Sequence, residues 1–289
     1  MEKFENFPLR CITSFKIGGP ARTVFFIKRK EELLQLLKEL KDEKFLLLGE
    51  ATNVLVPDEG LDYSVLINRI RGMKIDAESI VVSSGEKLFE VVKASVEAGL
   101  SGMEELAGIP GTIGGAVFGN AGAFGRQLSD LIEWVEFWKE GKIFRERGKN
   151  LYFGYRDSFF KREGGIILSV ALKLKSSVKE KIKSRVEKIL KERERKLPPP
   201  DSACAGSFFK NVILPNGRKL AAGKLLEDAG VKGLKVGGAE VSKKHANFII
   251  NTGNAKAKDV LALAKIMKRK VSEKFNINLE EEVIILNDP

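Results

Sequence analysis

Two glycine-rich stretches contain the residue types that bind phosphate groups. The first, LGEATNVLV at 48–56, begins where the apolar run FLLL at 45–48 ends, and the second is LAGIPGTIGGAVFGNAGAFG at 106–125. Glycine lets backbone N–H groups approach a ligand closely, and successive N–H groups form a concave site suited to a diphosphate. Neither stretch is a Rossmann or Walker A sequence. Together they could hold one dinucleotide, although each alone is as consistent with a tight turn.

Two further stretches place polar residues among aromatic ones. FGYRDSFFK at 153–161 contains Arg156 and Ser158, and AGSFFKN at 205–211 contains Ser207. A polar side chain flanked by apolar residues is a candidate for chemistry. The residues alone leave other roles open. Arg156 could form a structural ion pair, and Ser207, which follows a glycine, could belong to a turn or cap a helix.

A cluster of carboxylates precedes the last apolar run, LEEEVIIL at 279–286. In a strand alternate residues project to the same face, so Glu280 and Glu282 are expected on one side. Solvated carboxylates at the edge of a strand would give the same pattern. His245 is the only histidine, which argues against metal sites with several histidines and leaves no basis for a metal prediction.

Composition narrows the class of protein. The 289 residues suit two or three compact units, and a net charge of +11 admits nucleic acid, a membrane surface or a small polyanion as a partner. No zinc finger or other nucleic-acid motif is present, and basic and acidic residues alternate as on a solvated face, so we expect no nucleic-acid partner. Only Cys11 and Cys204 occur, and neither a leader-like start nor a long apolar stretch is seen. A cytoplasmic protein without membrane insertion is expected.

Periodicity predicts a mixture of strands and helices that positions these stretches. The apolar spacing of Leu33, Leu36, Leu37 and Leu40 predicts a helix at 31–41. Glu140-Gly141 predicts a hairpin within 133–146. The other predicted strands are 22–28, 45–48, 64–70, 79–84, 169–175, 247–251 and 282–286, and the other predicted helices are one containing Leu88, Val91, Val92 and Val96 and stopped by Gly99, 178–197, 221–229 and 256–274.

The helix at 178–197 supplies the main predicted boundary. Its apolar face is expected to carry Val178, Ile182, Val186, Ile189 and Leu190, and it ends at three consecutive prolines, 198–200. We expect three domains: 1–68, 69–197 and 198–289. The last strand of the chain is expected to pack back on the first of these domains.

In this order, these segments resemble the UDP-N-acetylenolpyruvoylglucosamine reductase (MurB) family. The resemblance rests on FKIGGPA at 15–21, both glycine-rich stretches, GYRDSFFK, AGSFFKN, the segment 221–251, GNAKAKDVL and LEEEV. Only 51 positions separate Arg156 from Ser207, which is similar to the shorter subtype without a substrate-covering insertion.

The resemblance implies an α+β fold, with a two-part FAD-binding unit of the vanillyl-alcohol-oxidase type followed by a C-terminal α+β substrate domain. It implies noncovalent FAD reduced by NADPH, and reduction of UDP-N-acetylglucosamine enolpyruvate to UDP-N-acetylmuramate for peptidoglycan synthesis. A monomer is expected, and the positive charge would assist capture of these polyanions.

The resemblance also implies roles for individual residues. Arg156 would bind the substrate carboxylate with its planar fork of donors, Ser207 would donate a proton as general acid, and Glu282 would assist. Substrate contacts are expected from Tyr155, Lys196, Lys210 and Asn211, the two lysines being possible sources of positive charge near Ser207. Cofactor contacts are expected from Gly49, Glu50, Ala51, Thr52, Asn53, Val54, Gly108, Ile109, Pro110, Gly111, Thr112, Gly114, Gly115, Ala116, Asn120 and Ala121.

Departures from the family pattern affect local contacts. Glu50 stands in Gly-Glu-Ala-Thr-Asn where Gly-Gly-Gly-Ser-Asn is more usual, Val212 replaces proline, and Ile284 replaces arginine. Packing or hydrogen bonding is expected for His245, and burial for Cys204. Two other functions remain open: a flavin oxidase of the same cofactor fold, and a nucleotide-sugar binding or regulatory protein with a degenerate site.

Overall fold

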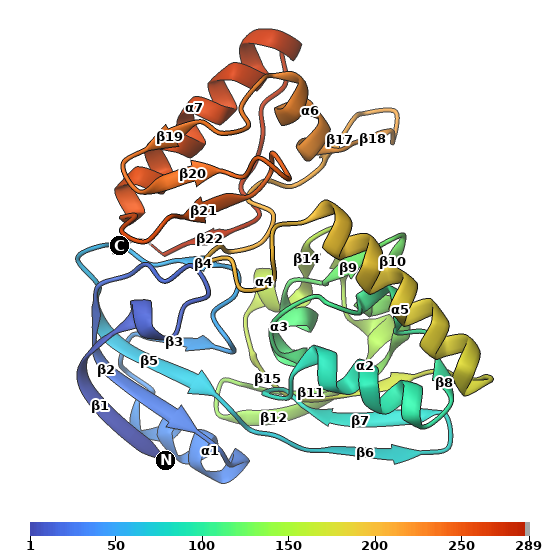
Figure 1. Ribbon diagram of the computed structural model, residues 1–289. Coiled ribbons are helices and arrows are strands. Elements are labelled where there is room, and N and C mark those ends of the chain that lie inside the picture. The colour runs from blue at the N-terminus through green and yellow to red at the C-terminus, as the bar shows by residue number, and fades with distance from the viewer. Residues whose placement is uncertain (287–289) are drawn as a thin grey trace. The chain divides into compact units, whose positions relative to one another are not determined.

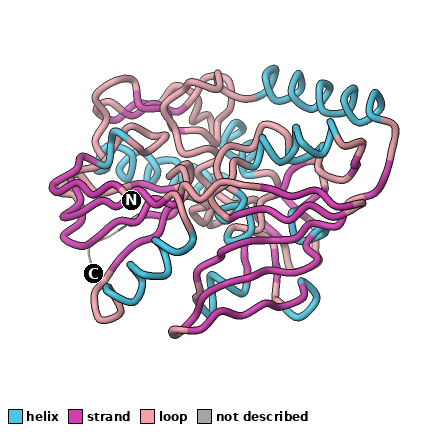
Figure 2. Tube along the Cα trace, turned by 90° about the horizontal axis from the view of Figure 1, so that it is seen from below, coloured by secondary structure: helices cyan, strands magenta, loops and turns pink. Residues whose placement is uncertain are grey.

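The computed structural model describes residues 1–286 and divides into two compact units that interleave along the chain (Figure 1). Both units contain helices and strands. Figure 2 colours the helices of the chain cyan and its strands magenta. Unit 1 comprises Met1–Phe4, Val24–Glu50 and Tyr63–Arg193. Unit 2 comprises Glu5–Thr23, Ala51–Asp62 and the chain from Glu194 onward. This division into two units does not test the three predicted domains, 1–68, 69–197 and 198–289, which remain a prediction.

A five-stranded antiparallel sheet forms the frame of unit 1. The predicted hairpin is confirmed: Lys139 pairs with Lys142 across a turn in which Glu140 has φ 48° and Gly141 has φ 82°. Positive φ at both central residues matches the twist of the flanking strands. The strand order is β12-β11-β15-β7-β6, with β6 at Met73–Asp76, β7 at Ser79–Ser83, β11 at Ile132–Lys139, β12 at Lys142–Arg147 and β15 at Ile166–Lys173.

The helix α2 (Leu88–Glu97) buries the apolar face that its sequence predicts. Leu88, Val91 and Val92 are fully buried in the same core as the strands β7, β11 and β15, and Val96 is nearly so. The helix ends at Glu97 with Ala98 as its C-cap, and Gly99 follows with φ 67°. The predicted helix and its stop are therefore confirmed.

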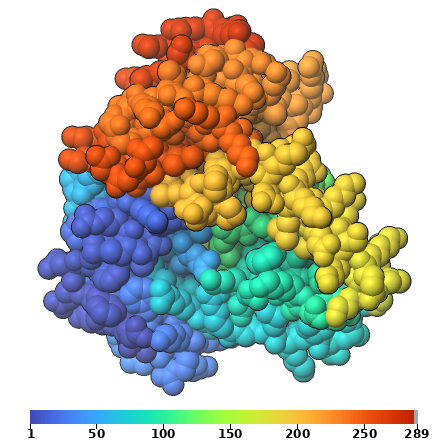
Figure 3. All heavy atoms as spheres, viewed as in Figure 1, coloured from blue at the N-terminus to red at the C-terminus, as the bar shows by residue number. Residues whose placement is uncertain are grey.

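The helix α5 (Lys179–Lys196) lies at the surface of unit 1, where Figure 3 shows its yellow atoms. Ile182 and Ile189 are buried, and Val186 and Leu190 pack partly buried against the core. The placement of Val178 on this face is wrong, because Val178 precedes the helix and is 63% exposed.

A second sheet has the strand order β1-β2-β5-β3. Its helix α1 (Lys30–Glu39) packs Leu33, Leu36 and Leu37 into a core with Leu66 of β5, as its spacing predicts. The strand β1 was not predicted. Five of its seven residues are exposed and the other two are only partly buried, so it shows no alternation of buried and exposed residues. The strands are β1 at Glu2–Pro8, β2 at Pro20–Ile27, β3 at Phe45–Leu48 and β5 at Leu61–Asn68.

Unit 2 is built around the helix α7 (Ala257–Phe275). Asp58, from the N-terminal part of the chain, accepts hydrogen bonds from the backbone N–H groups of Ala257 (2.7 Å) and Lys258 (3.2 Å). A carboxylate there satisfies orphan donors and complements the helix dipole. The rest of unit 2 includes β4 at Val54–Leu55, β17 at Val212–Ile213, β18 at Lys219–Leu220, α6 at Ala222–Asp228, β19 at Lys235–Val236, β20 at Ala239–Val241, β21 at Ile249–Asn251 and β22 at Ile284–Ile285.

The core of unit 2 joins residues far apart in sequence. Phe15, Ile17 and Leu55 from the first part of the chain lie in one buried cluster with residues of α6 and α7. The final strand β22 pairs in parallel with β4, Ile284 beside Val54. The N-terminal segments are therefore an integral part of this unit.

Short elements complete the described chain. The short strands are β8 at Leu100–Ser101, β9 at Gly122–Ala123, β10 at Arg126–Gln127, β13 at Phe153–Gly154, β14 at Asp157–Ser158 and β16 at Lys175–Ser176. The short helices are α3 at Ile113–Phe118, α4 at Phe159–Glu163 and 3-10 turns at Leu9–Cys11, Glu104–Leu106, Leu128–Leu131 and Gly148–Asn150. Within residues 1–286, no helix combines the length and apolar composition needed to cross a bilayer.

Candidate functional site

The two glycine-rich stretches meet inside unit 1 at Gly49 and Thr112. A Cβ atom added at Gly49 would overlap the Thr112 hydroxyl and lie 2.9 Å from its Cγ2. Gly49 follows directly after β3, and Thr112 is the N-cap of α3, where its hydroxyl accepts from the Gly115 N–H at 3.2 Å. Two segments that sequence reasoning assigned to one ligand are thus in close contact.

Backbone hydrogen bonds fix the second stretch beside the sheet. The Gly111 carbonyl accepts from the Leu88 N–H at 3.0 Å, and the Glu86 carbonyl accepts from the Ile113 N–H at 2.8 Å. Gly114 has no room for a side chain, because a Cβ there would lie 2.9 Å from both the Cβ and the carbonyl oxygen of Ser84. The loop is therefore held in one conformation by its neighbours.

Several backbone donors of these loops have no acceptor. Among residues 1–286, the N–H groups of Glu50, Gly111 and Thr112 donate no hydrogen bond. Gly111 has φ 110°, a conformation that glycine adopts without strain. Backbone donors of this kind need water or a ligand as acceptor, and a phosphate oxygen is a suitable one. The loops consequently fit the diphosphate of a dinucleotide.

Glu50, the departure in the first stretch, is held in a cluster of charges. Its carboxylate lies 3.2 Å from Lys87 Nζ and 3.4 Å from an Arg71 nitrogen, and Arg71 also lies 3.5 Å from Glu86. Two cations and two carboxylates make this cluster neutral, so Glu50 adds no net negative charge at the loop. Sequence reasoning did not identify Arg71 or Lys87, because nothing in their local sequence indicates this partner.

Asn120 connects the second stretch to the hairpin that carries Arg156. Its side chain is 1% exposed; the amide nitrogen donates to the Gly154 carbonyl at 2.8 Å and to Gln127 at 3.1 Å, and the amide oxygen accepts from the Ser129 N–H at 3.1 Å. All of these contacts are within the protein. The side chain of Asn120 therefore holds the neighbouring loops in place, and only its backbone is left to contact a ligand.

Arg156 occupies the turn between β13 and β14. It has φ 57°, its guanidinium donates to the Gly122 carbonyl at 2.9 Å, and it lies over the ring of Tyr155 at 5.2 Å. Ser158, next in the same stretch, is fully buried, caps α4 and donates to the Phe118 carbonyl at 2.7 Å. The structure thus assigns Ser158 a capping role and leaves Arg156 in a strained turn, half-buried beside the second stretch.

Ser207 and Glu282 belong to unit 2, where backbone bonds bring their segments together. The Phe208 carbonyl accepts from the Glu282 N–H at 2.8 Å, and the Phe208 N–H donates to the Asn247 carbonyl at 2.8 Å. The buried Asn247 side chain also bridges both backbone groups of Phe209, at 2.9 and 2.8 Å. Within the described part of the chain, the half-buried Ser207 hydroxyl has no hydrogen-bond partner.

The other predicted residues of unit 2 have definite neighbours. Lys210 pairs with the exposed Glu280 at 3.2 Å, and the Asn211 side chain accepts from the Ala222 N–H at 3.0 Å. Lys196 lies in the last turn of α5. Asn53 of the first stretch donates to the Glu282 carbonyl at 3.1 Å.

His245 has the packing and hydrogen bonding expected of it, whereas Cys204, expected to be buried, is only partly buried. The Asn247 N–H donates to His245 Nδ1 at 3.2 Å, Phe248 contacts the ring edge-on, and a Cβ at Gly223 would lie 2.7 Å from the ring. Burial lowers the pKa of His245 and raises the pKa of the Cys204 thiol. Neither environment suits a charged, reactive group.

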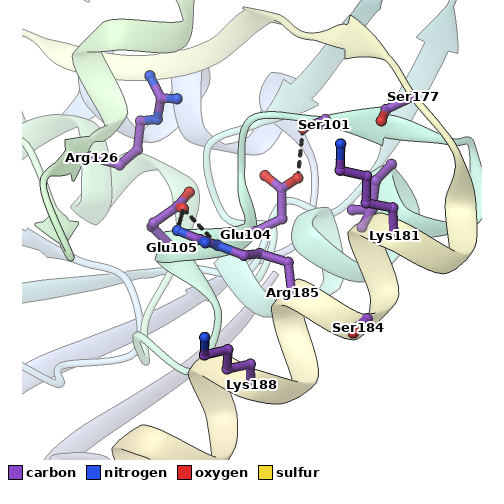
Figure 4. A pocket seen from close by; sticks show the side chains of 10 residues that line it. Ser101, Glu104, Glu105, Arg126, Ser177, Lys181, Ser184, Arg185 and Lys188 are labelled. Atoms are coloured by element: carbon purple, nitrogen blue, oxygen red, sulfur yellow. Dashed lines mark hydrogen bonds and ion pairs between the residues drawn. The ribbon is translucent and has the colours of Figure 1, made fainter.

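A surface cleft of about 390 Å³ lies on unit 1 beside α5 (Figure 4). Its lining includes Arg126, Lys181, Arg185 and Lys188, and Arg185 is paired with Glu105 at 2.7 Å. No predicted site residue lines it. Because none of the predicted residues lines this cleft, we place the functional site at the glycine-rich loops instead.

Comparisons with known proteins match this chain over nearly its whole length. Residues 198–286 match the family described as UDP-N-acetylenolpyruvoylglucosamine reductase, C-terminal domain, and residues 21–146 match an FAD binding domain. The reductase of that name from Pseudothermotoga lettingae is 40% identical over 278 residues, covering 96% of this chain and 95% of the relative. That from Thermotoga sp. strain RQ2 is 41% identical over 278 residues, covering 96% and 91%.

A solved structure agrees. The crystal structure of UDP-N-acetylenolpyruvylglucosamine reductase from Thermus caldophilus matches with a TM-score of 0.82 and 36% identity, over 99% of this chain and 98% of that one. Together with the FAD binding domain match, this confirms the predicted α+β class with an FAD-binding part and a C-terminal domain.

Proposed function

Because the chain belongs to the UDP-N-acetylenolpyruvoylglucosamine reductase family, we propose that it uses FAD and NADPH to reduce UDP-N-acetylglucosamine enolpyruvate to UDP-N-acetylmuramate. The product would serve peptidoglycan synthesis in the cytoplasm, with the protein acting as a monomer. The domains 1–68 and 69–197 would form the cofactor unit, and 198–289 the substrate domain.

The residues present fit FAD. The contact of Gly49 with Thr112 and the free N–H groups of Glu50, Gly111 and Thr112 support a diphosphate resting on these loops. Bound FAD would supply hydride transfer, taking a hydride from NADPH and giving one to the enol ether. The chain's own residues would hold the reacting groups and supply the proton.

Arg156 would bind the substrate carboxylate. Hydride addition to the distal carbon of the enol ether places negative charge next to that carboxylate, and a guanidinium stabilises such charge through paired N–H donors. The bond from Arg156 to the Gly122 carbonyl and the stacking on Tyr155 orient the guanidinium before substrate arrives. Tyr155 would also contact the substrate.

Ser207 would then deliver a proton to the adjacent carbon. The observation that carries this proposal is a half-buried hydroxyl that has no partner in the described part of the chain. It lies on a segment fixed by backbone bonds to Asn247 and Glu282. A hydroxyl is a weak acid, so nearby positive charge would assist it, for which Lys196 and Lys210 are candidates. Glu282 would support the developing charge through a protonated carboxyl or a water, and Asn211 would contact the substrate.

The proposed function is tested with the purified protein under anaerobic conditions. NADPH should bleach the flavin absorbance, and the enolpyruvyl substrate should restore it. With Ser207→Ala, bleaching should be unchanged and recovery slowed by about 10²–10⁴-fold, the usual contribution of a general acid. Ser202→Ala, a half-buried serine of the same connecting segment, is the matched control and should leave both phases unchanged.

Other results would point elsewhere. Recovery of the flavin only on admitting oxygen would indicate the oxidase, and a protein that binds the nucleotide sugar but no flavin would indicate the binding or regulatory function. Recovery in Ser207→Ala at the wild-type rate would remove the proton-donor role while leaving the reductase assignment intact.

A further inference from the structure

Arg193, in the last turns of α5, lies directly on the second glycine-rich stretch. A Cβ added at Gly108 would be 2.9 Å from Arg193 Nε and 3.1 Å from its Cδ, with Leu190 Cδ2 also at 3.1 Å. Gly108 has φ 75°. The absence of a side chain at Gly108 therefore leaves room for the arginine side chain against the loop.

The guanidinium of Arg193 has no counter-charge among residues 1–286. Within residues 1–286 it makes neither a hydrogen bond nor an ion pair, although only part of the side chain is exposed. Burial lowers the pKa of Arg193, and no carboxylate contributes in the opposite direction. Arg185, two turns earlier on the same helix, is by contrast paired with Glu105 at 2.7 Å. A guanidinium carries five donors, and leaving all of them unsatisfied while partly buried is unfavourable.

An anion on the loop would satisfy these donors. The stretch that Arg193 touches also contains the free N–H groups of Gly111 and Thr112. Backbone donors and a guanidinium together bind phosphate well, since the planar fork of arginine engages two phosphate oxygens at once. All of these groups belong to unit 1. A diphosphate bound on this loop could therefore accept hydrogen bonds from the backbone N–H groups and from the Arg193 guanidinium.

We propose that Arg193 binds the diphosphate of the dinucleotide cofactor where it rests on the 108–112 loop. The residue lies outside the segment 21–146 that matches the FAD binding domain, so α5 supplies a cofactor contact that this segment lacks. The inference rests on the FAD binding of the proposed function. The cofactor is favoured over the nucleotide sugar because Arg193 touches Gly108, in the stretch that fits the cofactor.

The test compares cofactor affinity in apoprotein prepared from wild type, Arg193→Met and Arg193→Lys. Arg195→Met is the control, because Arg195 is an exposed arginine of the same helix. FAD and riboflavin are titrated by quenching of flavin fluorescence. Arg193→Met should weaken FAD binding by about 10- to 100-fold, the usual effect of losing hydrogen bonds to a charged group, and leave riboflavin binding unchanged because riboflavin has no phosphate. Arg193→Lys should lie between, and Arg195→Met should match wild type.

The stability of the apoprotein separates binding from a structural role. If Arg193 awaits a ligand, Arg193→Met removes an unpaired charge, so the apoprotein should melt at the wild-type temperature or above it. Its stabilisation by added FAD should be smaller than that of wild type.

Three results would overturn the proposal. One is equal weakening of riboflavin and FAD, and another is an apoprotein that Arg193→Met destabilises or prevents from folding, since both indicate a structural arginine. The third is unchanged FAD affinity with a raised KM for the nucleotide sugar. Failure of wild type to bind FAD at all would instead refute the proposed function, so the two failures are distinguishable.

Discussion

The side-chain amide of Asn53 donates a 3.1 Å hydrogen bond to the main-chain carbonyl of Glu282. In return the Asn53 carbonyl accepts from the Ile284 N–H at 3.0 Å. A residue of the first glycine-rich stretch therefore sets the position of the backbone at a predicted catalytic residue, 229 positions later in the chain.

Asn53→Ala should destabilise the protein and impair the site together. Losing one hydrogen bond and leaving the partly buried Glu282 carbonyl unsatisfied should lower the free energy of unfolding by about 1–2 kcal/mol. Urea unfolding measures this change, and turnover of the enolpyruvyl substrate should fall with it. Asn150→Ala, which removes an exposed bond to Glu146, is the control and should change stability by less than about 0.5 kcal/mol. Equal losses of unfolding free energy in the two variants would show that the Asn53 bond stabilises the protein no more than an exposed hydrogen bond does.

Gly49→Ala should push the two glycine-rich stretches apart. The added methyl group would overlap the Thr112 side chain, and steric overlap of this kind costs about 1–3 kcal/mol. Combining it with Thr112→Ala should cost less than the sum of the two single changes, because the obstructing atoms are then absent. Urea unfolding of the apoproteins measures the coupling, and strict additivity would contradict the contact. Gly115→Ala is the control, since its Cβ would meet only an ordinary contact at 3.5 Å.

Asn120→Ala should produce a large loss of stability without touching a titrating or reacting group. Its amide makes two donated bonds and one accepted bond while 1% exposed, so the change leaves Gly154, Gln127 and Ser129 with unsatisfied groups. A loss of about 2–4 kcal/mol is expected. Asn216→Ala, in an exposed loop, is the comparison. A loss near that of Asn216→Ala would mean that water replaces these bonds.

His245 should make stability depend on pH near neutrality. Burial lowers its pKa from the ordinary 6.5, so the folded protein keeps it neutral while the unfolded chain takes up a proton as pH falls below that value. The contribution of His245 to the free energy of unfolding should therefore be fully present above about pH 6.5 and should decline below it. In His245→Gln this decline should disappear between about pH 7.5 and 5.5, because no other histidine is present. Carboxylates with lowered pKa, such as Glu136, lose their contribution only below their ordinary value of 4.5. Urea unfolding at a series of pH values measures this. If the free energy of unfolding fell equally with pH in wild type and in His245→Gln, the assignment of the decline to His245 would be wrong.

Periodicity was enough to predict the longer elements. The helices α1, α2, α5, α6 and α7 and the hairpin β11-β12 follow from apolar spacing and from Glu140-Gly141. The helices α3 and α4, with six and five residues, are too short for a period to show. The interleaving of the units was also beyond local reasoning, because the burial of Phe15 and Leu55 depends on residues of α6 and α7 far along the chain.

The sequence predicts the two loops of the proposed cofactor site but not the charged side chains around them. Glycine spacing identified both loops, but the partners of Glu50 could not be found, because Arg71 and Lys87 lie in other elements. Arg193 did leave a signal: it stands four residues after Ile189 and three after Leu190, which places it on the buried face of α5. An arginine on an apolar face requires a partner, but the local sequence does not indicate that this face lies against Gly108.

The mixed origin of unit 2 constrains how the protein can be made. Phe15, Ile17 and Leu55 leave the ribosome long before Val260 and Leu263, the α7 side chains that share their core. Until synthesis is almost complete, these early residues stay exposed to solvent and to other nascent chains, where they invite aggregation. Shielding by chaperones during translation is therefore a greater need for this chain than for one whose domains follow each other in sequence.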